Sequence, residues 1–182
     1  MGGRSGMAGA GSVEWRRKGT FEAQMSALIG RYVNKIDKKG RVSIPKPFRD
    51  AFADQSFAGI YAYPSFKFPA LEASGEAFIE RVAASLDDLD MFSDEQDDLA
   101  AVILENAYSL PFDTEGRVIL PKDLVDHAGL KGEAVFVGRG TRFRIWAPDA
   151  YDLHRAEAFE NARRRGITLP LRPGPGEPRG SQ

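Results

Sequence analysis

Two stretches of the chain carry nearly the same sequence: residues 36–49 read IDKKGRVSIPKPFR and residues 112–125 read FDTEGRVILPKDLV. At an offset of 76 positions they share six of fourteen residues, where average composition gives about one. Each copy of such a repeat is one supersecondary unit, so a repeat bears on architecture before any single motif does. We therefore expect two copies of one structural unit within the chain.

Each copy predicts a strand, a tight turn and a returning strand. Asp37 and Asp113 can accept hydrogen bonds from the backbone amides of the turn, and Gly40 and Gly116 supply the positive φ that the turn requires. Arg41 opens the returning strand, whose side chains alternate between a core face and an available face. We therefore assign Asp37, Gly40, Asp113 and Gly116 to the structure of the turns.

A short helix and further strands follow each turn. Pro45 ends the first returning strand and pre-sets a helical φ for the next residues, and the second copy repeats this arrangement. Strand-forming regions then follow over residues 59–68 and 134–146, the second of which carries Trp146 as an expected packing residue. Strands and helices together predict an α+β fold.

The segment between the copies is acidic and helical. Residues 76–105 hold ten acids against Arg81, a local net charge of −9. Apolar residues recur there at helical spacing, with a break near residues 91–94. The carboxylates do not match calcium-loop spacing, so we interpret them as a solvated face rather than a metal or acid–base site.

These patterns divide the chain into consecutive segments. We expect a disordered N-terminal extension (1–27), repeat 1 (31–76), an acidic helical connection (77–106), repeat 2 (107–150), a C-terminal helix (151–162) and a disordered basic tail (163–182).

Composition excludes several classes of protein. The chain has 182 residues, a formal net charge of −1 and no cysteine, which excludes disulfide scaffolds and cysteine-based zinc fingers. Apolar runs are too short to span a membrane and no signal peptide is evident, so we expect a cytoplasmic protein. His127 and His154 form no zinc-enzyme motif, and nucleophile elbows and phosphate loops are missing. We therefore predict no catalytic residues, no metal, no cofactor and no small-molecule substrate.

The two copies differ in charge. Residues 36–50 carry five bases and two acids, whereas residues 112–126 carry two bases and four acids. The tip of the first turn is Lys38-Lys39, and the tip of the second is Thr114-Glu115. We expect the first copy to face phosphates and the second to complete the fold and the subunit contacts.

The paired motif Asp-x-x-Gly-Arg-Val-x-Ile/Leu-Pro-Lys, with the acidic helical segment and the later HAGLKGEAVFVGRGTRFRIW, resembles the MraZ family of bacterial transcriptional regulators. The resemblance covers about residues 28–160. It implies two pseudo-symmetric swapped-hairpin (SpoVT/AbrB-like) motifs that close into one β-barrel-like unit with flanking helices. It also implies a regulator of its own operon and of division and cell-wall genes, which binds direct repeats in double-stranded promoter DNA as a ring-like homo-oligomer. We expect a nucleoid-associated repressor, while the sequence leaves activation open as the alternative.

The resemblance and the charge pattern together give the candidate DNA-binding residues, namely Lys38, Lys39, Arg41, Lys46 and Arg49. Lysines can neutralise phosphates, and an arginine can address a guanine edge with two hydrogen bonds. Arg41 is the candidate for base readout. Arg117 stands at the matching position of the acidic copy, so an equally open interpretation is that both arginines brace their turns.

Other functions stay open. An antitoxin with the same hairpin motif would also bind DNA and would use a disordered tail against a toxin, although the duplicated motif and the helical insert argue against it. A non-enzymatic assembly or partner-binding role is a further alternative. Charge alone also allows RNA binding, but no RNP-like strand or GXXG loop supports it.

Overall fold

The computed structural model describes residues 27–170, so most of the two segments expected to be disordered lies outside the described residues. The first copy comprises β1 (Arg31–Lys35), β2 (Arg41–Ser43), α1 (Lys46–Asp50), β3 (Gly59–Pro64) and β4 (Ala70–Ser74). The second comprises β5 (Tyr108–Pro111), β6 (Arg117–Ile119), α4 (Lys122–His127), β7 (Glu133–Gly138) and β8 (Arg142–Trp146). The remaining helices are α2 (Glu76–Asp87), α3 (Asp94–Ile103) and α5 (Pro148–Arg165). The expected α+β class is confirmed.

The strand order shows how the two copies exchange partners. Six antiparallel strands run in the order β1-β7-β8-β4-β3-β5, and β2 pairs with β6 in a separate ribbon. Replacing each strand by its counterpart in the other copy gives the same order read backwards. The outer strand of each copy therefore pairs with the other copy, β1 with β7 and β5 with β3.

The expected barrel-like closure is not seen. The large sheet is open, with β1 and β5 at its two edges. The chain leaves β1 at the first turn and enters β2, which lies in the separate ribbon with β6. At this turn the two sheets are linked by an isolated bridge between Ile36 and Val42 and by a hydrogen bond of 2.7 Å from the Asn34 side-chain amide to the Ser43 carbonyl, not by a continuous ladder. The ribbon therefore covers one face of the sheet instead of closing it.

The main core lies between the large sheet, the ribbon and the short helices α1 and α4. Phe48 of α1 is fully buried, and its ring centroid lies 5.3 Å from that of Tyr32 and 5.1 Å from that of Phe143. Leu124 of α4 is equally buried at the related position. The apolar positions shared by the two copies thus meet in one core. Trp146, expected to pack, is also buried, but on the other face of the sheet beneath α5.

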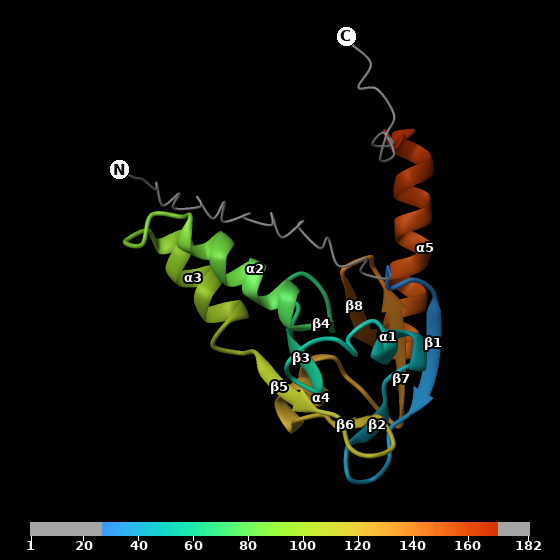
Figure 1. Cartoon of the computed structure of the whole chain (residues 1–182). Helices are drawn as coiled ribbons and strands as arrows, with labels where there is room; N and C mark the ends of the chain where they lie inside the picture. The colour runs from blue at the N-terminus through green and yellow to red at the C-terminus, as the bar shows by residue number, and fades with distance from the viewer. Residues whose placement is uncertain (1–26, 171–182) are drawn as a thin grey trace, which may run out of the picture.

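Three longer helices extend away from the sheet. In Figure 1, the α2–α3 hairpin and α5 leave the sheet as two diverging arms, on the side opposite the ribbon. Two helices with a break were expected over residues 77–106, and both are confirmed. The last helix is longer than the expected 151–162. It begins with Pro148 at its first position and continues to Arg165, where Gly166 adopts a left-handed conformation and ends it.

Carboxylates hold both turns. Asp37 accepts hydrogen bonds from the backbone amides of Lys39 (2.8 Å) and Arg41 (3.0 Å) and from the Nε of Arg41 (2.6 Å). Gly40 has a φ of 76°. The predicted turn residues of the first copy therefore have the predicted roles, and Arg41 braces the turn. The hydrogen bonds, above all that from the Arg41 amide, hold the pKa of Asp37 below its usual value.

The second turn repeats this geometry. Asp113 accepts hydrogen bonds from the amides of Glu115 and Arg117, both at 2.9 Å, and from the Nε of Arg117 at 2.8 Å. The hydrogen bonds from Arg117 are the main reason why the pKa of Asp113 is lowered to about 2. Gly116 has a φ of 72°. A charged carboxylate is therefore part of the folded state of each turn.

Truncating Phe48 tests the main core. We expect Phe48→Ala to lower the free energy of unfolding by about 3 to 5 kcal/mol, because it leaves a cavity where two other rings now pack. Phe66 is 58% exposed, so Phe66→Ala is the control and should cost less than about 1 kcal/mol. Chemical denaturation measures both. Equal effects of the two substitutions would contradict the core described above.

The Asp113 turn predicts a pH dependence of stability. The folded-state pKa of about 2 lies below the ordinary value of 3.8, so the contribution of Asp113 is complete above about pH 4 and is lost as the pH falls through 2. Asp113→Asn should therefore reduce the free energy of unfolding at pH 6, and the difference from the parent protein should shrink towards pH 2. The exposed Asp54, changed to Asn, is the control. A difference that stays constant from pH 6 to pH 2 would contradict this account.

Candidate nucleic-acid interface

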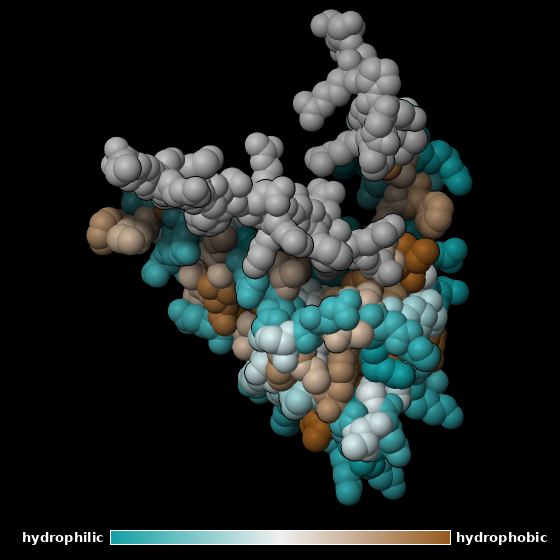
Figure 2. Space-filling model, viewed as in Figure 1, coloured by the Kyte–Doolittle hydropathy of each residue, from teal (hydrophilic) through white to brown (hydrophobic). Residues whose placement is uncertain are grey.

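The ribbon fixes the two turns beside each other at one end of the molecule. The amide of Leu120 donates to the carbonyl of Gly40 at 2.9 Å, and the amide of Ile44 donates to the carbonyl of Gly116 at 3.1 Å. Each turn is therefore bonded to the strand that follows the other turn. Figure 1 shows both turns projecting at the end opposite the helical arms, and Figure 2 shows this end as largely hydrophilic. The candidate surface is thus formed by the two copies together.

The first turn presents two lysines to solvent. Lys38 and Lys39 lie at its tip, and both side chains are exposed. Neither forms an ion pair with any residue in the described part of the chain. Their charges are therefore available to an anionic partner, and phosphates of nucleic acid are such a partner.

The two bracing arginines differ in the number of carboxylates that pair with them. Arg117 donates through Nε to Asp113 and lies with Nη1 2.6 Å from a carboxylate oxygen of Glu115. These partners, first of all the hydrogen bond to Asp113, raise the pKa of Arg117. Arg41 has the equivalent Nε bond, but Lys39 stands where Glu115 stands in the second turn. The terminal nitrogens of Arg41 therefore face no carboxylate of their own turn.

Arg41 can brace its turn and still have nitrogens available for a base. The bond to Asp37 shows that Arg41 braces the first turn, and it uses only Nε. A guanidinium held in this way is restricted in orientation and can still offer its two terminal nitrogens. Bracing and base recognition are therefore compatible at Arg41, whereas at Arg117 the acidic turn takes up the same charge.

Lys46 lies at the start of α1 and forms an exposed ion pair. Its Nζ is 2.6 Å from a carboxylate oxygen of Asp50, and the side chains are 74% and 60% exposed. Lys122 and Asp126 form the matching pair in the second copy. Exposed pairs of this kind contribute little to stability. A phosphate can therefore compete with Asp50 for Lys46 at small cost.

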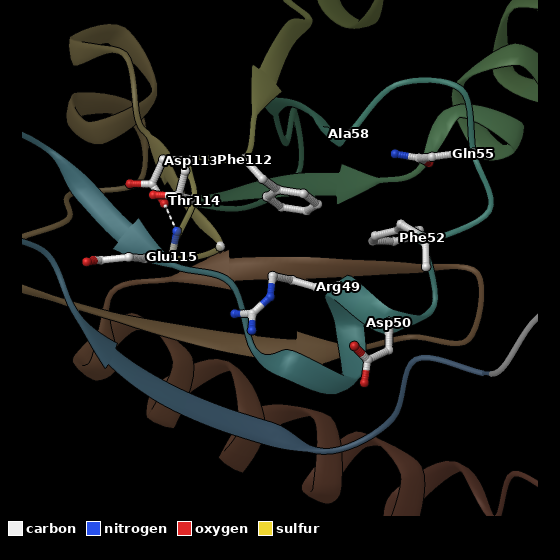
Figure 3. A pocket seen from close by; sticks show the side chains of 11 residues that line it. Arg49, Asp50, Phe52, Gln55, Ala58, Phe112, Asp113, Thr114 and Glu115 are labelled. Atoms are coloured by element: carbon white, nitrogen blue, oxygen red, sulfur yellow. Dashed lines mark hydrogen bonds between the residues drawn. The ribbon is translucent and has the colours of Figure 1, made fainter.

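Arg49 lies against the second turn and not beside Lys38 and Lys39. Its Nη1 donates to the carbonyl of Ile44 at 2.7 Å. Figure 3 shows its side chain reaching from α1 towards the turn that carries Glu115, across a pocket of about 410 Å³. A Cβ at Gly116 would lie only 2.5 Å from the Nε of Arg49. The exchange of strands brings α1 over the turn of the other copy, so Arg49 is placed to hold that turn.

The structure also adds a residue that the sequence did not indicate. The amide of Ile36 donates to the carbonyl of Gly132 at 2.8 Å, and Lys35 is paired with Glu133 in the β1–β7 register. This places the exposed Lys131 on the loop beside the base of the first turn. Lys131 is more than 90 positions away in the chain, so only the strand register reveals its position.

Both histidines have structural contacts. His127 Nε2 lies 3.0 Å from the carbonyl oxygen of Ser65, and the ring of His154 stacks on Trp146 at a centroid distance of 4.7 Å.

Within residues 27–170, no group of three or more histidine, aspartate or glutamate side chains is arranged to hold a metal ion. Over the same residues, no helix is both long and apolar enough to cross a membrane.

Comparison with known proteins identifies the family. A family model described as "MraZ protein, putative antitoxin-like" matches residues 103–168. The transcriptional regulator MraZ of Gluconacetobacter diazotrophicus is 44% identical over 149 residues, which cover 80% of this chain and 93% of that protein. The transcriptional regulator MraZ of Rickettsia canadensis is 39% identical over 145 residues, which cover 80% of this chain and 97% of that protein. Because the similarity extends over nearly the whole length of these relatives, the chain belongs to the MraZ family of transcriptional regulators.

Proposed function

We propose that this protein represses its own operon and division and cell-wall genes by binding short tandem repeats in promoter DNA as a homo-oligomer. The observation that carries this proposal is the difference between two turns of the same geometry. The first turn exposes Lys38 and Lys39, which pair with no carboxylate of residues 27–170, whereas Glu115 in the second turn pairs with Arg117. One turn is thus available to an anion, and its structural twin is neutralised.

We assign different parts of DNA recognition to different residues. Lys38 and Lys39 contact phosphates, which gives affinity and salt dependence without sequence information. Arg41 reads a guanine edge with its terminal nitrogens, while Asp37 fixes its orientation through Nε. Base recognition of this kind requires a side chain held in place, and the turn supplies that restraint.

Three further residues support the same surface. Lys46 and Lys131 extend the positive charge beyond the turn, and both are exposed. Arg49 acts as a positioning residue, because its guanidinium lies against Gly116 of the second turn while Nη1 is held by the carbonyl of Ile44 in the first copy. The proposal involves no catalytic residue, metal or cofactor.

The described part of a protomer offers one basic turn whose lysines form no ion pair there, so we propose that binding requires several protomers. An oligomer that places equivalent turns along repeated sites raises their effective concentration without any new contact. The protein is then expected in the cytoplasm in association with the nucleoid. A ring-like arrangement of protomers satisfies this requirement when its turns all face the same way.

The description of the matching family model includes the word antitoxin, which keeps a second candidate function in view. An antitoxin would form a stable complex with a small toxin. Purification of the tagged full-length chain from its native host tests this. A stoichiometric small partner that blocks growth when expressed alone would favour the antitoxin function over the regulator.

Binding to promoter DNA and to a shuffled duplex tests the assignment of residues. We expect Arg41→Ala to weaken promoter binding by about 1 to 3 kcal/mol and to leave shuffled DNA nearly unaffected, because it removes base recognition. Lys39→Ala should weaken both and reduce the salt slope by about one. Fluorescence anisotropy across a salt series measures these effects.

Arg117→Ala is the matched control, because it removes the same brace from the acidic turn. It should leave binding to both duplexes close to that of the parent protein. If Arg41→Ala weakens binding to both duplexes equally, or if Arg117→Ala has the same effect as Arg41→Ala, then Arg41 only braces its turn and does not read bases.

The number of sites provides a second test of the same proposal. We expect a duplex with two or more tandem repeats to bind at least tenfold more tightly than a duplex of the same length with one repeat, because the second contact is intramolecular. Titration of both duplexes at one salt concentration measures the ratio. Equal affinity for the two duplexes would refute the need for several protomers.

A further inference from the structure

An open pocket lies on the sheet face away from the main core, beneath α5. It has a volume of about 200 Å³. Its walls combine aromatic side chains with arginines: Trp146, Tyr151, Phe159, Arg139, Arg144 and Arg155. A cavity of roughly 150 Å³ already accommodates a benzene ring. The pocket can therefore hold one aromatic side chain between cationic groups.

The arginines around this pocket are short of acidic partners. Glu72 accepts hydrogen bonds from both Arg142 and Arg144. Burial, together with the charges of Arg144 and Arg142, lowers the pKa of Arg139. Neither Arg139 nor Arg155 forms an ion pair with any of residues 27–170. Positive charge is thus concentrated at an aromatic pocket, which suits an occupant that is both apolar and acidic.

The tip of the α2–α3 hairpin has this chemistry. Met91 and Phe92 are 71% and 89% exposed, and Asp90 and Asp94 flank them. Figure 2 shows this apolar tip beside the hydrophilic surface of the hairpin. The amide of Phe92 donates to Asp90 at 3.1 Å, which holds the backbone of the tip in a turn. A segment whose backbone is already held in place loses less entropy on binding than a mobile one.

The tip cannot reach the pocket of its own chain. In Figure 1 the α2–α3 hairpin and α5 extend as separate arms that diverge from the sheet. The pocket lies beneath α5, on the other side of the gap between the two arms. The hairpin also has a net charge of −9 over residues 76–105, which complements the arginines of the pocket. A tip that enters this pocket must therefore come from a second copy of the chain.

We propose that the Met91–Phe92 tip of one copy inserts into the pocket beneath α5 of a second copy. Phe92 then packs among Trp146 and Phe159, and the acids beside it face Arg139 and Arg155. Tryptophan, tyrosine and arginine are the residue types that most often dominate the binding energy of protein interfaces. The contact joins two different surfaces, so successive copies assemble head to tail and close into a ring when the rotation allows it.

The proposal identifies the contact for the homo-oligomer of the proposed function, and it does not depend on DNA binding. The tip belongs to the α2–α3 hairpin, which extends away from the turns in Figure 1. The pocket lies between α5 and the strands β7 and β8. Assembly through the tip and the pocket leaves the first turn of every copy exposed. Repeated copies can then present their turns to repeated sites.

Two variants of the full chain test the contact. Phe92→Asp removes the apolar tip, and Arg155→Glu reverses a charge at the pocket; both residues are exposed, so the fold should persist. Sedimentation velocity should show an oligomer for the parent protein and a 20.0 kDa monomer for each variant alone. Their mixture should form a 1:1 dimer and nothing larger, because it contains one intact tip and one intact pocket. Circular dichroism verifies folding.

The controls separate this contact from other effects. Phe66→Asp changes an aromatic residue with 58% exposure outside both surfaces and should keep the mass of the parent protein. Lys39→Ala should also keep it, so that loss of DNA binding and loss of assembly are distinguished. A monomeric parent protein, variants with the parent mass, or a mixture that stays monomeric would each overturn the proposal. The proposal is also overturned if Arg155→Glu is monomeric while Phe92→Asp keeps the mass of the parent protein, because the pocket then has a different occupant.

Discussion

The pairing of β2 with β6 is the constraint on which the rest of the structure depends. Each strand is only three residues long, yet the reciprocal bonds from Leu120 to Gly40 and from Ile44 to Gly116 tie the start of each helix to the turn of the other copy. Neither copy can place its helix without the other, and the outer strands β1 and β5 are exchanged in the same way. The two copies therefore form one core, and the positions of both turns follow from it.

Within this symmetric frame, function depends on the few positions where the copies differ. Both turns have an aspartate, a glycine with positive φ and a bracing arginine, so their backbone geometry is the same. Lys39 in the first turn stands where Glu115 stands in the second, and this difference does not alter the backbone of the turns. It does mean that Arg117 has a second carboxylate partner in its turn and Arg41 has none in its own. Duplication supplies an internal comparison. The aspartate, the glycine and the Nε bond of the arginine occur in both turns and serve the fold, whereas the two lysines and the terminal nitrogens of Arg41 are available for recognition in the first turn only.

Local features could be predicted from the sequence, and features that depend on register could not. The turns, the short helices and the break between α2 and α3 follow from residues a few positions apart, and they were predicted. The location of Arg49 on the second turn and of Lys131 beside the first depends on pairing between distant segments. That the large sheet stays open could not be predicted either, because the sequence of one copy does not determine whether the β2–β6 ribbon pairs with the sheet. Packing of Trp146 was expected from the sequence. That arginines surround it could not be predicted, because their position depends on how the strands pair.

The placement of charge along the molecule links recognition to assembly. The net charge of −1 hides a basic turn at one end of the molecule and an acidic hairpin at the other. Charges separated by more than about 10 Å are largely screened at physiological ionic strength, so each end acts on its own surroundings. The acidic hairpin is repelled by DNA and attracted by arginines, whereas the lysines of the first turn are attracted by DNA. In the proposed assembly the contact between copies does not use the first turn, so each copy keeps its lysines available and several weak contacts with phosphate can add up along repeated sites.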